Sequence, residues 1–398
     1  MTADVIVVGG GIVGACCAYE LAGDGAAVTV LERGDWGAGC SWGNAGLLVP
    51  SHARPIAAPE NLRAGLRWML RRDSPFGLRV QPSLAPWLAR YVRASTAGRA
   101  ESGEALQRQL SVEGIARFEA MGVFGGFRRT GCLTVYTAED GAAAEVASPA
   151  GRALGARVLS AAEARELEPA LTGAVRAGVL FPHEAQCDPV RLVAELGSAA
   201  QARGVRLRRV EVRALGPGGL VRTADGDLRA GLVVVAAGAW SGRLARTLDV
   251  RLPMVAGKGY AVDFEPTASQ LRIPLYLHDE RCVANPMGSR LRVTGGLVLG
   301  ALEQRSEPRR VEAIRRAAAT VLGVRAAPRL TWSGLRPCTP DGLPVIGPHP
   351  RADRVLFATG HGMLGVTLGP LTGRVVADLA AGRTHPALPH LSPGRFGA

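Results

Sequence analysis

The sequence predicts an α/β protein with a discontinuous, Rossmann-type unit and a second domain whose mixed or antiparallel β-sheet carries helices. Two observations support this prediction. A strand-helix-strand pattern opens the chain, and a strand, a glycine-rich turn and a helix close it, with β-rich sequence between them. The chain has 398 residues, 47% of them hydrophobic, so it can bury a large core in more than one domain.

The opening pattern is the clearest element of the sequence. Residues 4–8 form a short run of β-branched residues, residues 12–22 have helical character, and residues 27–31 form a second apolar run after a turn at Gly25. Residues 36–59 are rich in Gly, Ser, Asn and Pro with few periodic apolar positions, as expected for a loop that contacts a ligand.

Further elements follow from the spacing of apolar residues and turns. We expect helices at 61–72, within 88–119, at 308–322 and from the C-terminal turn to 381, a helix-strand-helix series in 161–202, strands at 131–136, 205–212, 231–237 and 355–358, a hairpin-like turn at 216–226 and an antiparallel sheet in 255–302. The resulting domain division assigns 1–48, 155–252 and 330–398 to the Rossmann-type unit, and 49–154 and 253–329 to the second domain.

Charge and cysteine content exclude several classes of function. The net charge is +13, but the arginines are scattered and Lys258 is the single lysine, so no nucleic-acid partner is expected. The seven cysteines form no C-x-x-C pair and no zinc-type grouping, which predicts no metal site and a reduced, cytoplasmic setting. No run of about 18 apolar residues predicts a membrane-spanning helix.

The turn after the first strand matches G-x-G-x-x-G, with Gly9, Gly11 and Gly14 at the fixed positions. Glycines let the backbone approach a pyrophosphate, and the N-terminus of the following helix offers free N–H groups. Glu32 lies 18 residues after Gly14, where a carboxylate accepts hydrogen bonds from ribose hydroxyls and repels a 2′-phosphate. The pattern therefore predicts a site for NAD or FAD and disfavours NADP.

A second match, Gly360 to Gly365, follows the last predicted strand. No further strand and acidic residue follow it, so it is not a second dinucleotide site. The helix N-terminus there is suited to the flavin edge that gains negative charge on reduction, although an ordinary strand-helix turn has the same pattern.

These motifs, taken together and in order, resemble the FAD-dependent D-amino acid oxidase superfamily. The pattern is most similar to that of the bacterial D-amino acid dehydrogenase small subunit. The resemblance extends from residue 4 to about residue 383 and is carried by Glu32-Arg33, residues 40–46 (CSWGNAG), residues 236–241 (AAGAWS), residues 334–337 (GLRP), residues 339–342 (TPDG) and residues 359–365 (TGHGMLG).

The resemblance implies noncovalent FAD, since Gly334 stands where sarcosine oxidase has the cysteine that bonds its flavin. The implied cofactor contacts come from both ends of the chain and from its middle. They are Gly9, Gly11, Ile12, Val13, Gly14, Glu32, Arg33, Cys40, Ser41, Asn44, Ala45, Gly46, Leu47, Val212, Ala237, Gly238, Trp240, Arg336, Gly360, His361, Gly362, Met363, Leu364 and Gly365.

Two residues are candidates for contact with the substrate. The resemblance places Arg336 of the Gly-Leu-Arg-Pro motif against an amino acid carboxylate, and a guanidinium suits that role because it makes two parallel hydrogen bonds and stays charged. His52 either lines the substrate pocket or is a structural loop residue. Lys258 has no assigned role.

The implied function is oxidation of the CH–NH bond of a small D-amino acid, with D-proline and hydroxy-D-proline among the candidates. Hydride would pass to flavin N5, leaving an imine or 2-oxo acid, and the electrons would pass to a quinone or another acceptor. An oxygen-using glycine or sarcosine-type oxidase and a non-catalytic flavoprotein subunit remain alternatives. Arginines 63, 67 and 71 share one helical face, which either contacts the inner face of a membrane peripherally or faces solvent.

Overall fold

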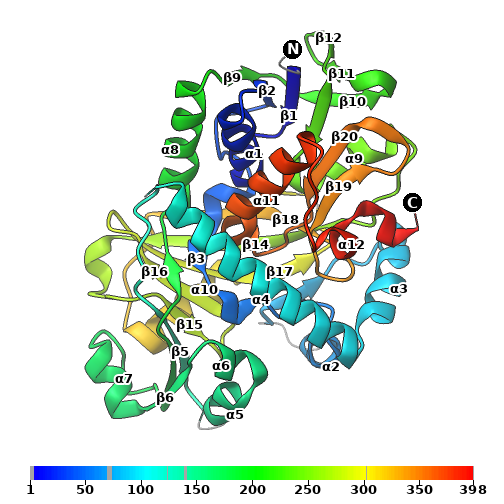
Figure 1. The fold of residues 1–398 in the computed structure, drawn as a ribbon. Helices are drawn as coiled ribbons and strands as arrows, with labels where there is room; N and C mark the ends of the chain where they lie inside the picture. Colours follow the sequence, from blue (N-terminus) through cyan, green and yellow to red (C-terminus); the bar gives the residue numbers. More distant parts are fainter. Residues whose placement is uncertain (1–3, 70–73, 123, 139–140, 302, 398) are drawn as a thin grey trace.

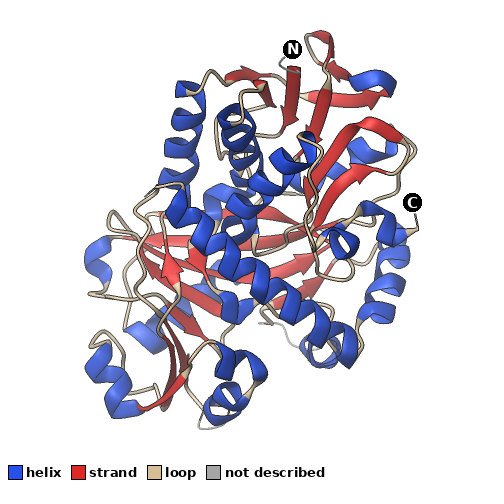
Figure 2. Ribbon diagram, in the orientation of Figure 1, coloured by secondary structure: helices blue, strands red, loops and turns tan. Residues whose placement is uncertain are grey.

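The computed structural model describes residues 4–69, 74–122, 124–138, 141–301 and 303–397. Their strands form two large β-sheets with helices packed on them (Figure 1, Figure 2). Two smaller sheets join β10 (Val212–Gly216), β11 (Leu220–Thr223) and β12 (Gly226–Arg229), and β3 (Leu47–Leu48) with β8 (Ala185–Gln186). The predicted fold class is confirmed.

The first large sheet is mostly parallel and contains both ends of the chain. Parallel pairing joins β9, β2, β1, β13 and β20 in that order, and β19 pairs with β20 in the antiparallel sense. The strands are β1 (Asp4–Val8), β2 (Ala27–Glu32), β9 (Arg206–Arg209), β13 (Leu232–Val235), β19 (Val345–His349) and β20 (Ala352–Thr359). The central strands are rich in valine and buried, as expected for a sheet covered on both faces.

The second large sheet contains nine strands and is mostly antiparallel. Its order is β18, β14, β17, β16, β15, β5, β7 and β6, with β4 beside β17. The strands are β4 (Phe76–Leu78), β5 (Cys132–Tyr136), β6 (Arg157–Ser160), β7 (Ala177–Phe181), β14 (Val255–Phe264), β15 (Leu275–Leu277), β16 (Cys282–Pro286), β17 (Leu291–Leu299) and β18 (Leu330–Cys338). The antiparallel sheet expected in 255–302 is confirmed, although β15 also pairs with β5 in parallel.

Helices cover both sheets. The α-helices are α1 (Ile12–Gly23), α2 (Pro59–Met69), α3 (Ala85–Ala94), α4 (Ala97–Ala120), α5 (Ala142–Ala147), α6 (Pro149–Ala153), α7 (Ala161–Leu167), α8 (Pro189–Ala202), α9 (Ser241–Arg246), α10 (Pro308–Leu322), α11 (Gly365–Ala380) and α12 (Leu388–Leu391). Short 3-10 turns are η1 (Cys40–Gly43), η2 (Pro50–His52), η3 (Pro82–Leu84), η4 (Pro217–Gly219), η5 (Gly238–Trp240), η6 (Pro266–Ala268) and η7 (Pro393–Phe396). Within the residues described, no helix has the length and apolarity needed to cross a membrane.

Most sequence-predicted elements are present, with two corrections. The single strand expected at 205–212 is two strands, because β9 joins the first sheet and β10 begins the small three-stranded sheet. The helix expected at 61–72 begins earlier, at Pro59, and is described to Met69, so the part of that prediction at residues 70–72 lies outside the described residues.

Strand pairing also disagrees with parts of the predicted domain division. Strands β6 and β7 lie in 155–252 and β18 lies in 330–398, yet all three belong to the nine-stranded sheet. Their partners, β5 and β14, are distant in sequence, so the pairing was not visible from local pattern. We therefore propose new boundaries in place of those at 155 and 330. The chain leaves the second domain and enters the Rossmann-type unit after β7, and it does so again after β18.

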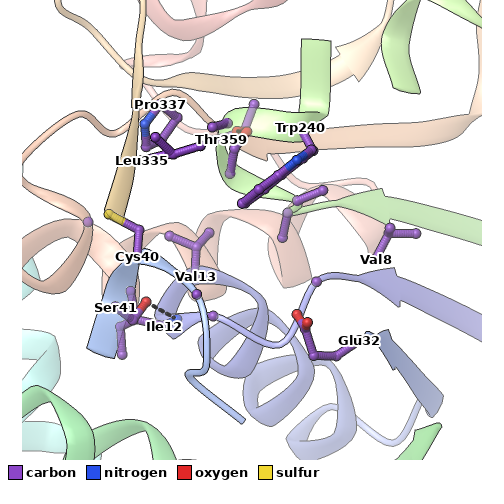
Figure 3. A pocket seen from close by; sticks show the side chains of 18 of the residues that line it. Val8, Ile12, Val13, Glu32, Cys40, Ser41, Trp240, Leu335, Pro337 and Thr359 are labelled. Carbon is purple, nitrogen blue, oxygen red and sulfur yellow. Dashed lines mark hydrogen bonds between the residues drawn. The ribbon is translucent and has the colours of Figure 1, made fainter. Parts of the chain in front are cut away.

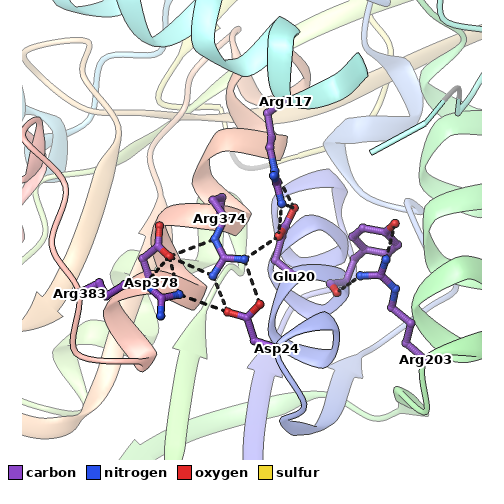
Figure 4. Close-up of polar contacts among 8 residues, drawn as sticks. Glu20, Asp24, Arg117, Arg203, Arg374, Asp378 and Arg383 are labelled. Carbon is purple, nitrogen blue, oxygen red and sulfur yellow. Dashed lines mark hydrogen bonds and ion pairs between the residues drawn. The ribbon is translucent and has the colours of Figure 1, made fainter. Parts of the chain in front are cut away.

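A cluster of ion pairs joins helices α1 and α11, which pack on the first sheet, to α4, which packs on α11 (Figure 4). Glu20 of α1 is only 3% exposed and accepts hydrogen bonds from Arg117 of α4 and Arg374 of α11, with closest nitrogen–oxygen distances of 2.6 and 3.1 Å. Arg374 also pairs with Asp24 and Asp378, and its hydrogen bond lowers the pKa of the Asp24 carboxyl. The cluster therefore connects the helices that follow the two glycine-rich turns.

Candidate active site

A cavity of about 420 Å³ lies where the carboxyl ends of β1, β13 and β20 face strand β18 of the second sheet. Figure 3 shows Trp240, Thr359, Leu335 and Pro337 on one side of this cavity, with Ile12, Ser41 and Glu32 on the other. Ligands of open α/β sheets bind at this carboxyl edge, so we take this cavity as the candidate active site.

The first glycine-rich turn is packed so closely that side chains do not fit. Gly9 has φ +108°, a conformation that favours glycine. A Cβ atom on Gly14 would lie 1.9 Å from the carbonyl oxygen of Gly9, so α1 can start against β1 only with a glycine there. The close approach leaves the backbone of Gly9 and Gly11 on the cavity wall.

Glu32, at the end of β2, lies beside this turn. Its Oε2 atom accepts the Gly10 N–H at 2.8 Å and its Oε1 atom accepts the Gly34 N–H at 3.1 Å. The neighbouring Arg33 guanidinium stacks over the Trp240 ring at 4.0 Å. Arg33 and Trp240 thus bring β2 and the segment after β13 together at one end of the cavity.

The loop after β2 contributes a second wall. The Ser41 hydroxyl accepts the Ile12 N–H at 2.9 Å, at the N-terminus of α1, and the Asn44 side chain accepts the Gly46 N–H at 2.8 Å. Cys40 also lines the cavity; burial raises the pKa of its thiol, and the charge of Arg336 partly opposes this rise.

The second glycine-rich turn closes the cavity from the C-terminal part of the chain. The Gly362 N–H donates to the Pro337 carbonyl at 3.0 Å, which fixes the turn against β18. The ring of His361 is buried, its Nε2 atom lies 2.9 Å from the Thr372 hydroxyl, and burial lowers its pKa to about 4. His361 is therefore neutral at physiological pH.

Arg336 lies on β18, between two residues that line the cavity, Leu335 and Pro337. Its Nη1 atom donates to the Gly296 carbonyl at 2.9 Å. A Cβ atom on Gly259 of the paired strand would lie 2.1 Å from that Nη1 atom, so the glycine makes room for the guanidinium. Arg336 itself does not line the cavity.

His52 lines a smaller neighbouring cavity, together with Met363 and Leu364. His361 and Gly362 line both cavities, so the two adjoin at the second glycine-rich turn. The His52 ring packs edge-on against Tyr276, with ring centres 4.4 Å apart. Burial, together with Arg281 and His278, lowers the pKa of His52 to about 4, which makes it a poor proton acceptor at neutral pH.

The structure gathers most of the predicted cofactor contacts at one cavity. Those that line it are Gly9, Gly11, Ile12, Val13, Glu32, Arg33, Cys40, Ser41, Asn44, Val212, Ala237, Gly238, Trp240, His361, Gly362 and Gly365; those that do not are Gly14, Ala45, Gly46, Leu47, Arg336, Gly360, Met363 and Leu364. The lining residues that were not among the predicted contacts include Thr359, Gln304 and Arg243. Thr359 precedes the second glycine pattern and could have been found, whereas no motif marks Gln304.

Comparison with known proteins identifies the family. The family model described as FAD dependent oxidoreductase, DAO, matches residues 4–379. The chain belongs to this family. Curated relatives include the D-amino acid dehydrogenase of Paramagnetospirillum magneticum (35% identical, covering 95% of each chain) and D-amino acid dehydrogenase 2 of Ralstonia nicotianae (35% identical, covering 95% of this chain and 96% of the relative).

Solved structures with a similar fold align with nearly the whole of this chain. The glycine oxidase from Geobacillus kaustophilus has a TM-score of 0.75 and 27% identity over 99% of both chains. The L-proline dehydrogenase from P. horikoshii shares the fold with a TM-score of 0.73 at 20% identity, covering 100% of this chain and 98% of the other. The family and the prediction of an FAD-dependent oxidoreductase are thereby confirmed.

The residues of the cavity fit FAD. Bare backbone at Gly9 and Gly11 and the N-terminus of α1 suit a pyrophosphate, and the Glu32 carboxylate suits ribose hydroxyls. No described group of three His, Cys, Asp or Glu side chains is arranged to hold a metal ion. The noncovalent attachment and the individual contacts remain predictions.

Proposed function

We propose that this FAD-dependent oxidoreductase oxidises the CH–NH bond of a small D-amino acid. D-Proline and hydroxy-D-proline are candidate substrates. The proposal rests on the D-amino acid dehydrogenases among its relatives at 35% identity and on one observation, an arginine on β18 between Leu335 and Pro337, which both line the cofactor cavity. Bound FAD supplies the hydride acceptor, its N5 atom.

Arg336 binds the substrate carboxylate in this proposal. Its hydrogen bond to the Gly296 carbonyl uses one donor of a group that has five, and the pairing of β18 with β14 fixes the strand that carries it. A carboxylate held by such a fixed guanidinium would be oriented before reaction, which directs the Cα–H bond toward the flavin.

Neither of the two histidines that line the cofactor cavity or its neighbour is suited to take up the amine proton at neutral pH. His52 and His361 both have pKa values lowered to about 4 by burial. We therefore propose that the substrate reacts as the neutral amine, whose lone pair assists departure of the hydride from Cα. The product is an imine, which water hydrolyses to a 2-oxo acid and ammonia unless it is cyclic. His52 then acts as a neutral packing or hydrogen-bonding residue.

The test is to mix the holoenzyme anaerobically with a panel of D- and L-amino acids and to measure the loss of flavin absorbance. We expect small D-amino acids to bleach the flavin and Arg336→Leu to raise the substrate concentration needed by about 100-fold, as expected for a lost carboxylate contact. Arg329→Leu is the matched control, because Arg329 is 51% exposed and pairs with Glu265 just before β18. Unchanged affinity in Arg336→Leu would refute the assignment.

The electron acceptor is proposed to be a quinone or another acceptor other than oxygen. The 27% identity to a glycine oxidase favours the alternative, an oxygen-using oxidase. Hydrogen peroxide formed in air as fast as a quinone analogue is reduced would support that alternative. A flavin that no amino acid bleaches would instead support a non-catalytic subunit.

A peripheral contact with the inner face of a membrane is proposed for α2, whose sequence includes Arg63 and Arg67. Cosedimentation with anionic vesicles, and its absence with neutral vesicles, tests this contact. If the protein binds neither type of vesicle, the proposed contact is wrong.

A further inference from the structure

A second cavity, of about 300 Å³, lies between the nine-stranded sheet and helix α10. Its inner wall is formed by Tyr260 of β14, Cys282 of β16 and Gly296 of β17, and helix α10 closes it with Arg310 and Ile314. No described residue lines both this cavity and the cofactor cavity. The proposed reaction does not use it.

Arg310 is an unusual residue for such a place. It is 9% exposed, and its Nε and Nη1 atoms are buried without a hydrogen-bond partner. Glu307, the N-cap residue of α10, pairs with Lys258 at 2.8 Å and with Arg309 at 3.4 Å, and Glu312 pairs with Arg315. No ion pair is formed by Arg310 within the described residues. A buried guanidinium without an anion is costly, so Arg310 is suited to bind one from solution.

The same cavity contains an unpaired acid. Glu280 lies at its wall, and its Oε2 atom is buried without a hydrogen-bond partner. Burial and the charge of Asp279 raise the pKa of the Glu280 carboxyl, as expected for a carboxylate lacking a cation. Asp279 itself accepts hydrogen bonds from the Thr137 N–H and hydroxyl at 2.7 Å, so it is already satisfied.

A buried guanidinium and a half-buried carboxylate with one buried oxygen thus line one cavity without pairing with each other. A ligand with a carboxylate and an ammonium group would satisfy Arg310 and Glu280 together. We propose that this cavity is a second binding site for the zwitterion of a free amino acid, separate from the cofactor cavity. A monoanion such as a simple carboxylic acid would satisfy only Arg310.

The site adjoins the anchor of Arg336. Gly296 lines the second cavity, and its carbonyl accepts the hydrogen bond from Arg336. The residues on either side of Arg336 line the cofactor cavity. Gly296 has φ +73°, and the pairing of β14 with β17 shifts register between Lys258 and Tyr260, directly beside it. A ligand against Gly296 would therefore alter the position of Arg336; this coupling, unlike the binding itself, rests on the proposed function.

The test is calorimetric titration of the holoenzyme with 2-aminoisobutyrate, a zwitterion that lacks a Cα–H bond and cannot be oxidised at that carbon. We expect two sites per chain in the wild type, loss of one in Arg310→Gln and loss of the other in Arg336→Leu. Arg315→Gln is the matched control on α10, since Arg315 pairs with Glu312 at 2.9 Å outside the cavity, and it should keep both sites. Isobutyrate should bind the second site at least tenfold more weakly.

Each outcome has a distinct meaning. A single binding site per chain that is unchanged in Arg310→Gln would overturn the proposed second site. Binding of isobutyrate at the second site as tightly as 2-aminoisobutyrate would overturn it too. A site lost in Arg310→Gln, with no effect of Arg336→Leu, would support the second site and refute the proposed role of Arg336. If melting shows that Arg310→Gln does not fold, Glu280→Gln and the cavity-filling Ala313→Trp take its place, and retention of both sites in these variants would overturn the proposal.

Discussion

The two glycine-rich turns share one sequence pattern but differ in structure. In the first, Gly14 packs directly on the Gly9 carbonyl and Glu32 binds the Gly10 N–H at 2.8 Å. In the second, a Cβ on Gly365 would meet no atom closer than 3.8 Å, and the turn is fixed instead by the Gly362 hydrogen bond to Pro337.

The difference shows that the spacing of glycines does not by itself define a dinucleotide site. The first turn is built from tight contact between a strand and a helix, with an acid on the next strand. The second uses its glycines for φ values of +76° and +55° at Gly360 and Gly362, which bend the chain across the end of the cavity. One pattern therefore builds a tight strand-helix contact in one place and bends the chain across the end of the cavity in the other.

The largest expected effect is at the tightest contact. Gly14→Ala would place a Cβ 1.9 Å from the Gly9 carbonyl oxygen, so the backbone must move. We expect a loss of about 3 kcal/mol in unfolding free energy and FAD retention reduced about 100-fold, measured by urea melts and flavin absorbance. Gly173→Ala, with no atom within 4 Å of the new Cβ, is the control. Full FAD retention in Gly14→Ala would contradict the account of the first turn.

Glu32→Ala removes the acceptor of the Gly10 and Gly34 N–H groups and the proposed ribose ligand. We expect FAD to bind about 10 to 100 times more weakly, because a charge-assisted hydrogen-bond acceptor is lost. Equilibrium dialysis of the apoprotein measures this constant. Asp35→Ala is the control, since Asp35 is 73% exposed and pairs with Arg209. Equal losses in the two variants would mean that Glu32 has no special role.

Glu20→Gln should destabilise the contact between the helices that follow the two turns. Glu20 is nearly buried between Arg117 and Arg374, so losing its charge is expected to cost about 2 kcal/mol of unfolding free energy. Asp24→Asn, at 38% exposure, should cost less than about 1 kcal/mol. Urea melts give both values, and the reverse order would show that the cluster is not organised around Glu20.

The pH dependence of stability should reflect the buried histidine of the second turn. The folded pKa of His361 is about 4, below its ordinary value of 6.5, so the folded state binds fewer protons between these values. The contribution of neutral His361 to the unfolding free energy is fully present above about pH 6.5 and is lost as the pH drops toward 4. We expect His361→Asn to show a smaller decrease than the wild type in urea melts between pH 7 and 5. An identical decrease would indicate that His361 is solvated or protonated in the folded protein.

The smallest effect is expected at Gly365. Because the new Cβ would meet only His361 and Ile12 at 3.8 Å, Gly365→Ala should change the unfolding free energy by no more than about 0.5 kcal/mol. Melting of the apoprotein measures this change. A destabilisation as large as that of Gly14→Ala would mean that the two turns are packed alike.

Local elements and motifs were predictable from the sequence. Strand β1 and helix α10 have the predicted bounds, since strand and helix periods and proline placement are local signals. The carboxyl-edge cavity was also predictable, because the glycine turns and Glu32 mark it. Pairings between distant segments were not: nothing near residues 157–160 shows that they join β7, and nothing near Arg336 shows that it binds the Gly296 carbonyl.

The most direct test of the central claim, that both turns close one FAD site, is the flavin content of the purified chain. Absorbance after denaturation should give one FAD per chain, lost in Gly14→Ala and released without covalent attachment. A colourless protein that takes up no FAD, or a stoichiometry of two, would contradict the account.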